Sequence, residues 1–216
     1  MTNLFSVFDP CTGNFSLNWL STLIFLFIVP YKFWVLPSKG MLILNLTMSP
    51  LKKEINMIMP YKGIMLMMLS LFLLILINNI MGLIPYVFTS SSHLIFSLTM
   101  ALPLWMTLMI YGWVNKYNSM FTHLVPSGTP MALTPFMVLI ETVSNFIRPG
   151  SLSVRLTANM IAGHLLMSLL GGSATSLVMM ISTMIIFMIL MIFEIAVSMI
   201  QAYVFMTLST LYSSEI

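Results

Sequence analysis

Long apolar runs separated by short polar loops dominate the pattern of hydrophobic and polar positions along this chain. Residues 63–115 and 156–193 contain no charged side chain. A helix needs roughly 20 apolar residues to cross a hydrocarbon layer of about 30 Å, so the pattern predicts membrane-spanning helices at 17–35, 64–84 and 94–114. Turn-forming residues bound each of these segments.

Two further apolar tracts, 132–170 and 177–211, are too long to cross a membrane upright. A helix of nearly 40 residues measures about 58 Å, roughly twice the thickness of the hydrocarbon layer. Each tract must therefore be broken or steeply tilted. Pro149 and Gly150 allow a break in the first tract, but the second contains neither Pro nor Gly. We therefore expect a pair of long, tilted helices.

The segment 41–62 has a different character from the spans. Its first residues are apolar, Pro50 interrupts it, and the charged run that starts at Lys52 is followed by alternating apolar positions. This pattern is typical of a partly amphipathic helix at the membrane surface. Residues 1–16 form a polar, turn-prone N-terminal segment. The whole chain is expected to be one all-α membrane domain.

Composition strengthens this prediction and excludes other classes of protein. Hydrophobic residues make up 59 % of the chain, charged residues only 6 %, and the mean hydropathy is +1.04. Soluble domains carry roughly 25 % charged residues, so a water-soluble globule is excluded. The single cysteine, Cys11, also excludes a disulfide-stabilised fold.

The positions of the lysines predict how the chain is oriented. Lys32 lies at the end of the first predicted span, and the other five lie in the segments that follow the first and third spans. Basic loops remain on the inner side of a membrane, so the N-terminus is expected outside and the C-terminus inside. No positively charged start precedes the first apolar segment, so no cleavable signal is expected. The lysines are Lys32, Lys39, Lys52, Lys53, Lys62 and Lys116.

Four charged residues fall in the two long tracts, where they are costly. They are Glu141, Arg148, Arg155 and Glu194. A charge at the centre of a bilayer costs at least about 2.5–3.5 kcal/mol, and such residues usually face protein or water and mark a transport path.

Helical geometry groups the polar residues of these tracts. At 100° per residue, Glu141 and Arg148 lie within roughly 40° of Arg155, whereas His164 lies on the opposite face. Glu194 and Gln201 are seven residues apart and share one face. We therefore expect Glu141 and Ser144 toward the inner end, His164 and Glu194 toward the outer end, and Arg155 between them in depth.

This arrangement favours proton translocation. Carboxylates and imidazoles exchange protons, whereas an arginine does not. Two titratable groups separated by a permanent cation suggest two aqueous half-paths that do not join. The alternative is a buried structural Arg–Glu pair with a hydrogen-bonded histidine.

Four sequence blocks resemble subunit a of the F-type ATP synthase, in its mitochondrial form. They are NIMGLIP at 79–85, HLVPSGTP at 123–130, SVRLTANMIAGHLL at 153–166 and EIAVSMIQAY at 194–203. They occur in the family's order, and the resemblance runs from about residue 3 to the C-terminus.

The resemblance implies roles for individual residues. Arg155 matches the arginine that faces the rotating c-ring, attracts its carboxylate and blocks proton leak. Four residues match the half-channel open to the intermembrane side, and Glu141 with Ser144 matches the half-channel to the matrix. Arg148 is unassigned, beyond a role as an interfacial anchor. The four residues that match the half-channel open to the intermembrane side are Asn159, His164, Glu194 and Gln201.

The resemblance also implies an architecture and partners. It implies five membrane-embedded helices plus an amphipathic helix on the inner surface, with the last two helices tilted along the ring. The partners would be the c-ring, other membrane-sector and peripheral-stalk subunits, and the lipid of the mitochondrial inner membrane. Protons would be the transported ion. We expect no cofactor, metal, nucleic acid or nucleotide site of its own.

Competing classes fit the residues less well. Haem ligation needs paired histidines on facing helices, which three scattered histidines do not supply. A secondary transporter would show an internal repeat, and none is visible. We expect His93 and His123 to be structural or interfacial. Trp19, Trp34 and Trp113 lie near the ends of predicted spans, whereas Trp105 does not and has no assigned role.

Overall fold

A computed structural model of the chain describes residues 4–11, 13, 15–30, 35–59, 62–125, 130–173 and 176–214. Within these ranges the regular structure consists of helices. The α-helices are α1 (Ile24–Ile28), α2 (Lys39–Ile58), α3 (Lys62–Gly82), α4 (Leu94–Asn115), α5 (Tyr117–Leu124), α6 (Thr134–Gly172) and α7 (Leu177–Ser214). Short 3₁₀ helices are η1 (Leu4–Phe8), η2 (Leu17–Leu23), η3 (Ser90–Ser92) and η4 (Met131–Leu133). The expected all-α class is confirmed for this part of the chain.

Four helices in the described ranges are long and apolar enough to cross a membrane: α3, α4, α6 and α7. The sequence predicted five. The first predicted span, 17–35, is instead η2 followed by the short α1, which ends at Ile28. Val29 is extended (φ −68°, ψ 118°) because the next residue is Pro30, whose ring disfavours helical backbone in its predecessor. Residues 31–34 of the prediction, with Lys32 and Trp34, lie outside the described residues.

Pro50, which the sequence analysis took as an interruption of the 41–62 segment, is accommodated inside a helix. Pro50 lies within α2, which runs from Lys39 to Ile58, and residues 60 and 61 of the predicted 41–62 segment lie outside the described residues. Ser38 caps the start of the helix: its hydroxyl accepts a hydrogen bond from the Met41 amide at 3.4 Å. On α2, Glu54 accepts a hydrogen bond of 3.0 Å from the Tyr203 hydroxyl of α7. This bond ties α2 to the long helices.

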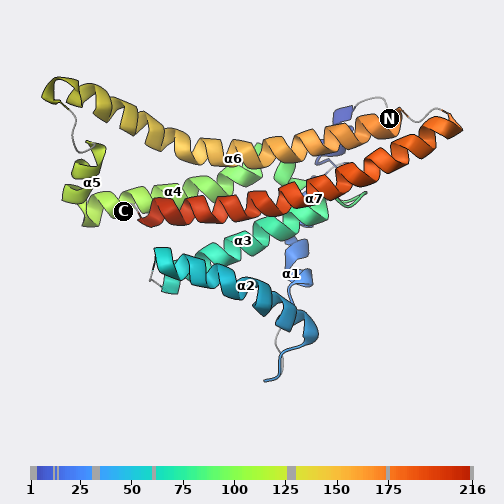
Figure 1. The fold of residues 1–216 in the computed structure, drawn as a ribbon, viewed down its shortest axis with the longest axis horizontal. Coiled ribbons are helices and arrows are strands. Elements are labelled where there is room, and N and C mark those ends of the chain that lie inside the picture. The colour runs from blue at the N-terminus through green and yellow to red at the C-terminus, as the bar shows by residue number, and fades with distance from the viewer. Residues whose placement is uncertain are drawn as a thin grey trace.

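The helices α6 and α7 form a long antiparallel hairpin along one side of the molecule (Figure 1). They contain 39 and 38 residues, so each is about 58 Å long. Pro149 lies inside α6 without ending it, and the helix is visibly curved. A proline removes one backbone hydrogen bond and bends a helix when packing holds both halves. Of the two alternatives, an unbroken pair is therefore the one observed.

The hairpin packs on α3 and α4: α3 lies along α7, below it in Figure 1, and α4 lies along α6, between α6 and α7 in that view. The main core lies where α3 and α4 meet the α6–α7 hairpin, with buried Ile75, Leu156, Ala202 and Met206 among its members. By contrast, only 6 % of the most apolar stretch of α7 is buried. That helix therefore presents an apolar surface that must meet lipid or another protein.

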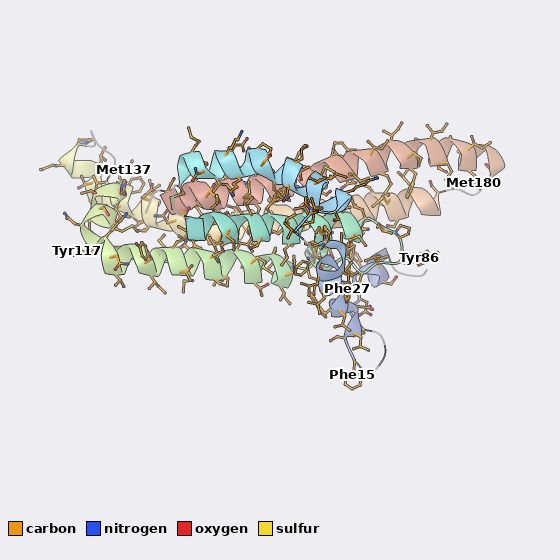
Figure 2. All side chains as sticks on the ribbon, turned by 90° about the horizontal axis from the view of Figure 1, so that it is seen from below. Phe15, Phe27, Tyr86, Tyr117, Met137 and Met180 are labelled. Atoms are coloured by element: carbon orange, nitrogen blue, oxygen red, sulfur yellow. The ribbon has the colours of Figure 1, made fainter. Side chains whose placement is uncertain are left out.

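The loops gather at two opposite ends of the bundle. Figure 2 shows Tyr86, in the α3–α4 loop, at the same end as Met180, which lies near the start of α7. Tyr117 and Met137 mark the other end. The α3–α4 loop and the start of α7 thus lie at one end of the bundle, and Lys116, which precedes Tyr117, lies at the other.

Candidate functional site

Arg155 lies near the middle of α6 on the exposed surface of the hairpin. It shares a narrow cleft with the half-buried Gln201 of α7, above the buried side chains of Leu156 and Phe205. Asn159 lies one turn further along α6 and is half-buried. Among the described residues, no carboxylate forms an ion pair with Arg155. The Arg155 side chain is therefore an exposed cation on this surface of the hairpin.

Glu194 is buried in α7, with only 6 % of its surface exposed. Its carboxyl group lies directly against Gly163 of α6: a Cβ atom added at Gly163 would be 2.5 Å from Cδ and 2.9 Å from Oε1 of Glu194. Only a glycine leaves room for the acid at this position. Sequence reasoning did not single out Gly163, because its importance depends on which residue of α7 faces it.

His164 follows Gly163 and points to a different space. It lines a cavity of about 670 Å³ at the end of the bundle marked by Tyr86. The ring of Phe8 in η1 meets the imidazole edge-on, with centroids 6.2 Å apart. The imidazole Nε2 is buried without a hydrogen-bond partner. His164 and Glu194 thus lie in the same half of the hairpin, but among the described residues no hydrogen bond joins them.

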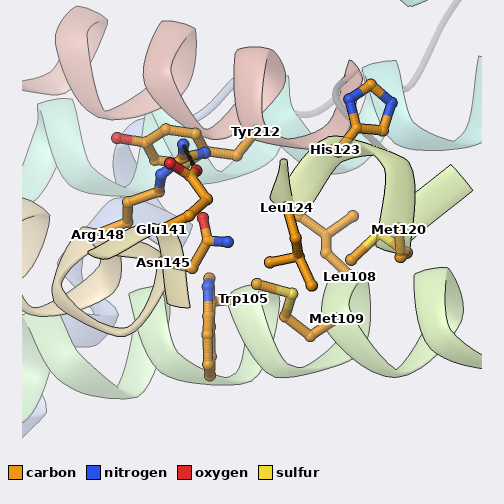
Figure 3. A pocket seen from close by; sticks show the side chains of 10 residues that line it. All are labelled: Trp105, Leu108, Met109, Met120, His123, Leu124, Glu141, Asn145, Arg148 and Tyr212. Carbon is orange, nitrogen blue, oxygen red and sulfur yellow. Dashed lines mark ion pairs between the residues drawn. The ribbon is translucent and has the colours of Figure 1, made fainter. Parts of the chain in front are cut away.

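The third group lies at the opposite end. The Oε1 atom of Glu141 is 3.6 Å from the guanidinium of Arg148, and that guanidinium lies over the ring of Tyr212, 4.9 Å from its centre. Figure 3 shows these side chains around one cavity of about 290 Å³. Ser144 donates its hydroxyl to the Glu141 carbonyl at 2.8 Å and does not line that cavity. The structure therefore gives Glu141 a cationic partner, Arg148, which sequence reasoning had left unassigned.

A buried polar cluster occupies the α3–α4 turn, where η3 packs against α6. Asn79 and Ser91 are both fully buried, and the side-chain amide of Asn79, the hydroxyl of Ser91 and the Nε2 atom of His93 have no hydrogen-bond partner. Buried polar groups of this kind usually bind ordered water. The sequence did not indicate this cluster, because no spacing along the chain shows that η3 packs against α6.

Within the described ranges, no three His, Cys, Asp or Glu side chains gather closely enough to hold a metal ion.

Together, the fold and the site define a helical membrane protein in which a long two-helix hairpin carries an outward-facing arginine between two separate groups of titratable residues. The chain belongs to the ATP synthase A chain family, whose model matches residues 15–214.

Curated relatives span the full chain. It is 53 % identical to ATP synthase subunit a of Locusta migratoria, and 54 % identical to the same subunit of Drosophila melanogaster and of Anopheles quadrimaculatus. Each alignment covers 100 % of this chain and 99 % of the relative. The resemblance read from the four sequence blocks is thereby confirmed.

Proposed function

We propose that this chain is the proton-conducting stator subunit in the membrane sector of an F-type ATP synthase. It would provide two offset half-channels to and from the carboxylates of the c-ring, and so couple proton flow to rotation. The observation that carries the proposal is the place of Arg155, exposed on the α6–α7 surface between two separate titratable groups. The alternative of a buried Arg–Glu pair is disfavoured for Arg155, because Arg155 is exposed and the observed ion pair joins Arg148 to Glu141, both of them partly exposed.

The outer half-channel would use four residues around and beyond Arg155. Water in the cavity beside His164 would deliver a proton to Glu194, which hands it to a ring carboxylate. Asn159 and Gln201 would orient water near Arg155 through their amides. The unpartnered atoms of Asn79 and Ser91 support hydration in this half of the molecule. The four residues of the proposed outer half-channel are Asn159, His164, Glu194 and Gln201.

The inner half-channel would use Glu141, with Ser144 beside it. A ring carboxylate that has completed nearly a full turn would release its proton toward Glu141 and the cavity in Figure 3. Arg155 would keep the two half-channels apart, because an arginine holds its charge and does not relay protons. The driving term is about 2.3 kcal/mol per charge for each 100 mV of membrane potential.

The proposed setting is the mitochondrial inner membrane, with the N-terminus in the intermembrane space and the C-terminus in the matrix. Five helices would be embedded, counting the short α1 with η2, and α2 would lie on the matrix surface. The exposed apolar face of α7 would meet the c-ring and lipid. Other membrane-sector and peripheral-stalk subunits would complete the stator. Nucleotide chemistry would take place elsewhere in the complex.

Thiol labelling tests whether the two half-channels open to opposite sides. Ser168→Cys would place a thiol in the cavity beside His164, and Asn145→Cys would place one in the cavity beside Glu141. Both changes are made with Cys11→Ser in the complete complex in sealed vesicles. A membrane-impermeant reagent should block proton flux in the first variant only from the outer side, and in the second only from the inner side. Block of both variants from the same side would contradict the proposal, and the Cys11→Ser complex is the unreactive control.

A further inference from the structure

Two residues that the proposed roles leave unexplained, Arg148 and Trp105, line the same cavity as Glu141. The cavity lies where α4, α5, α6 and α7 approach one another, at the end of the bundle marked by Tyr117. Its volume of about 290 Å³ has room for several water molecules. The polar groups on its wall therefore surround water as well as one another.

Arg148 is held from two sides. Glu141, two turns earlier on α6, lies 3.6 Å from the guanidinium, and Tyr212 of α7 lies beneath it at 4.9 Å. A cation is attracted to the face of an aromatic ring. The Tyr212 ring therefore holds the Arg148 guanidinium at the place where it meets Glu141. The distance of 3.6 Å is long for a direct hydrogen bond, so one carboxylate can face both the cation and water.

Trp105 provides an unused donor at the same place. Its indole ring packs against Phe146 with centroids 5.4 Å apart, which fixes the direction of the ring. The Nε1 atom is buried without a hydrogen-bond partner, and in Figure 3 it points toward Asn145 and the Glu141 carboxyl. A buried N–H group is costly unless something accepts its hydrogen. Water in the cavity is the acceptor that the geometry allows.

We infer that Arg148 and Trp105 are positioning residues for proton release from Glu141, an inference that rests on the proposed function. Protonated Glu141 gives its proton to a water molecule held by the Trp105 N–H group, and the proton leaves through the cavity to the inner solution. The carboxylate that remains is stabilised by Arg148, which Tyr212 holds in place. The cavity wall also carries the imidazole of His123, on α5.

A double-mutant cycle on the complete complex in vesicles tests this inference. Arg148→Gln should slow proton-driven ATP synthesis about tenfold, and Arg148→Lys should restore part of the rate because it restores the charge. In a Glu141→Gln background, Arg148→Gln should cause no further loss, because its effect passes through Glu141. Losses that multiply in the double variant would overturn the inference. Lys52→Gln, which removes a distant exposed cation, is the control.

The water-holding role has its own variant. Trp105→Phe keeps an aromatic ring against Phe146 but removes the N–H group, and should slow proton flux about two- to tenfold while the complex still assembles. The Trp105→Phe variant also keeps the inference testable if the Arg148→Gln complex does not assemble. An unchanged proton flux in the Trp105→Phe complex would overturn this role of Trp105. If Glu141→Gln alone leaves flux normal, it is the proposed inner half-channel that fails, not only the positioning by Arg148.

Discussion

The carboxyl group of Glu194 occupies the space that a side chain at Gly163 would fill. A Cβ atom at Gly163 would lie 2.5 Å from Cδ of the acid, well inside van der Waals contact. The pair joins the two long helices at a buried point beside His164. Glu194 can therefore occupy this place only if α6 carries a glycine opposite it.

Replacing Gly163 should displace the acid and impair proton transport. Gly163→Ala forces Glu194 out of its position, and overpacking of this kind typically costs about 1–3 kcal/mol. We expect proton-driven ATP synthesis to fall by about tenfold or more. Gly150→Ala on the same helix is the matched control, because a Cβ there meets nothing within 4 Å.

A second change should compensate for the first. The side chain of aspartate is one methylene shorter than that of glutamate, so Glu194→Asp should relieve the clash and recover part of the flux lost in Gly163→Ala. Rates are compared in vesicles that contain equal amounts of assembled complex. A Gly163→Ala complex with normal flux, or no recovery in the double variant, would contradict the packing relationship.

The side of the hairpin that carries Arg155 should face the c-ring. Ala158 is exposed one turn from Arg155, so Ala158→Cys should cross-link to a cysteine placed beside the ring carboxylate. Leu102→Cys on α4, also exposed, should give no such product. Both variants carry Cys11→Ser, and products are identified by mass. Cross-linking at Leu102 but not at Ala158 would show that the ring lies against another face.

The native cysteine reports the orientation of the N-terminus. Cys11 is exposed and is the single thiol of the chain. An impermeant maleimide should label it in mitochondria whose outer membrane has been opened, without any breach of the inner membrane. Labelling that requires access to the matrix would reverse the proposed orientation.

The same thiol should react slowly at neutral pH. A hydrogen bond to the Asp9 carboxylate, together with its negative charge, raises the pKa of the Cys11 thiol, so less thiolate is present at pH 7. Raising the pH toward 9 should accelerate labelling, close to tenfold per unit while the thiol is mostly protonated. Asp9→Asn should lower the pKa and accelerate labelling at pH 7. Equal rates in the two proteins would show that Asp9 does not control the thiol.

The long helices could be predicted from the sequence because a helix exposed to lipid needs nearly continuous apolar residues. Apolar tracts bounded near Lys62, Lys116 and Gly171 indicated where α3, α4, α6 and α7 would lie. Proline was harder to interpret. Pro149 and Pro50 are tolerated inside helices because neighbouring packing holds both halves, whereas Pro30 ends α1 after a short helix with little packing around it.

Most contacts between helices could not be predicted from the sequence in the same way. Glu141 and Arg148 share a helical stripe, so their pairing follows from spacing once α6 is continuous. The contact of Glu194 with Gly163 depends on the register between two helices, and no spacing within one helix specifies it. The same is true of Trp105 on α4, which reaches its cavity only because α4 packs beside α6.

Arg155 gives the most direct test of the central claim that one outward-facing cation separates two proton half-channels. The measurement is proton-driven ATP synthesis by the complete complex in sealed vesicles, with wild type, Arg155→Ala, Arg155→Lys and the surface control Lys52→Ala. We predict that Arg155→Ala loses synthesis by about two orders of magnitude or more, and that Arg155→Lys is severely impaired because it lacks the planar guanidinium. Lys52→Ala should behave as wild type. Synthesis at a normal rate by an assembled Arg155→Ala complex would contradict the account.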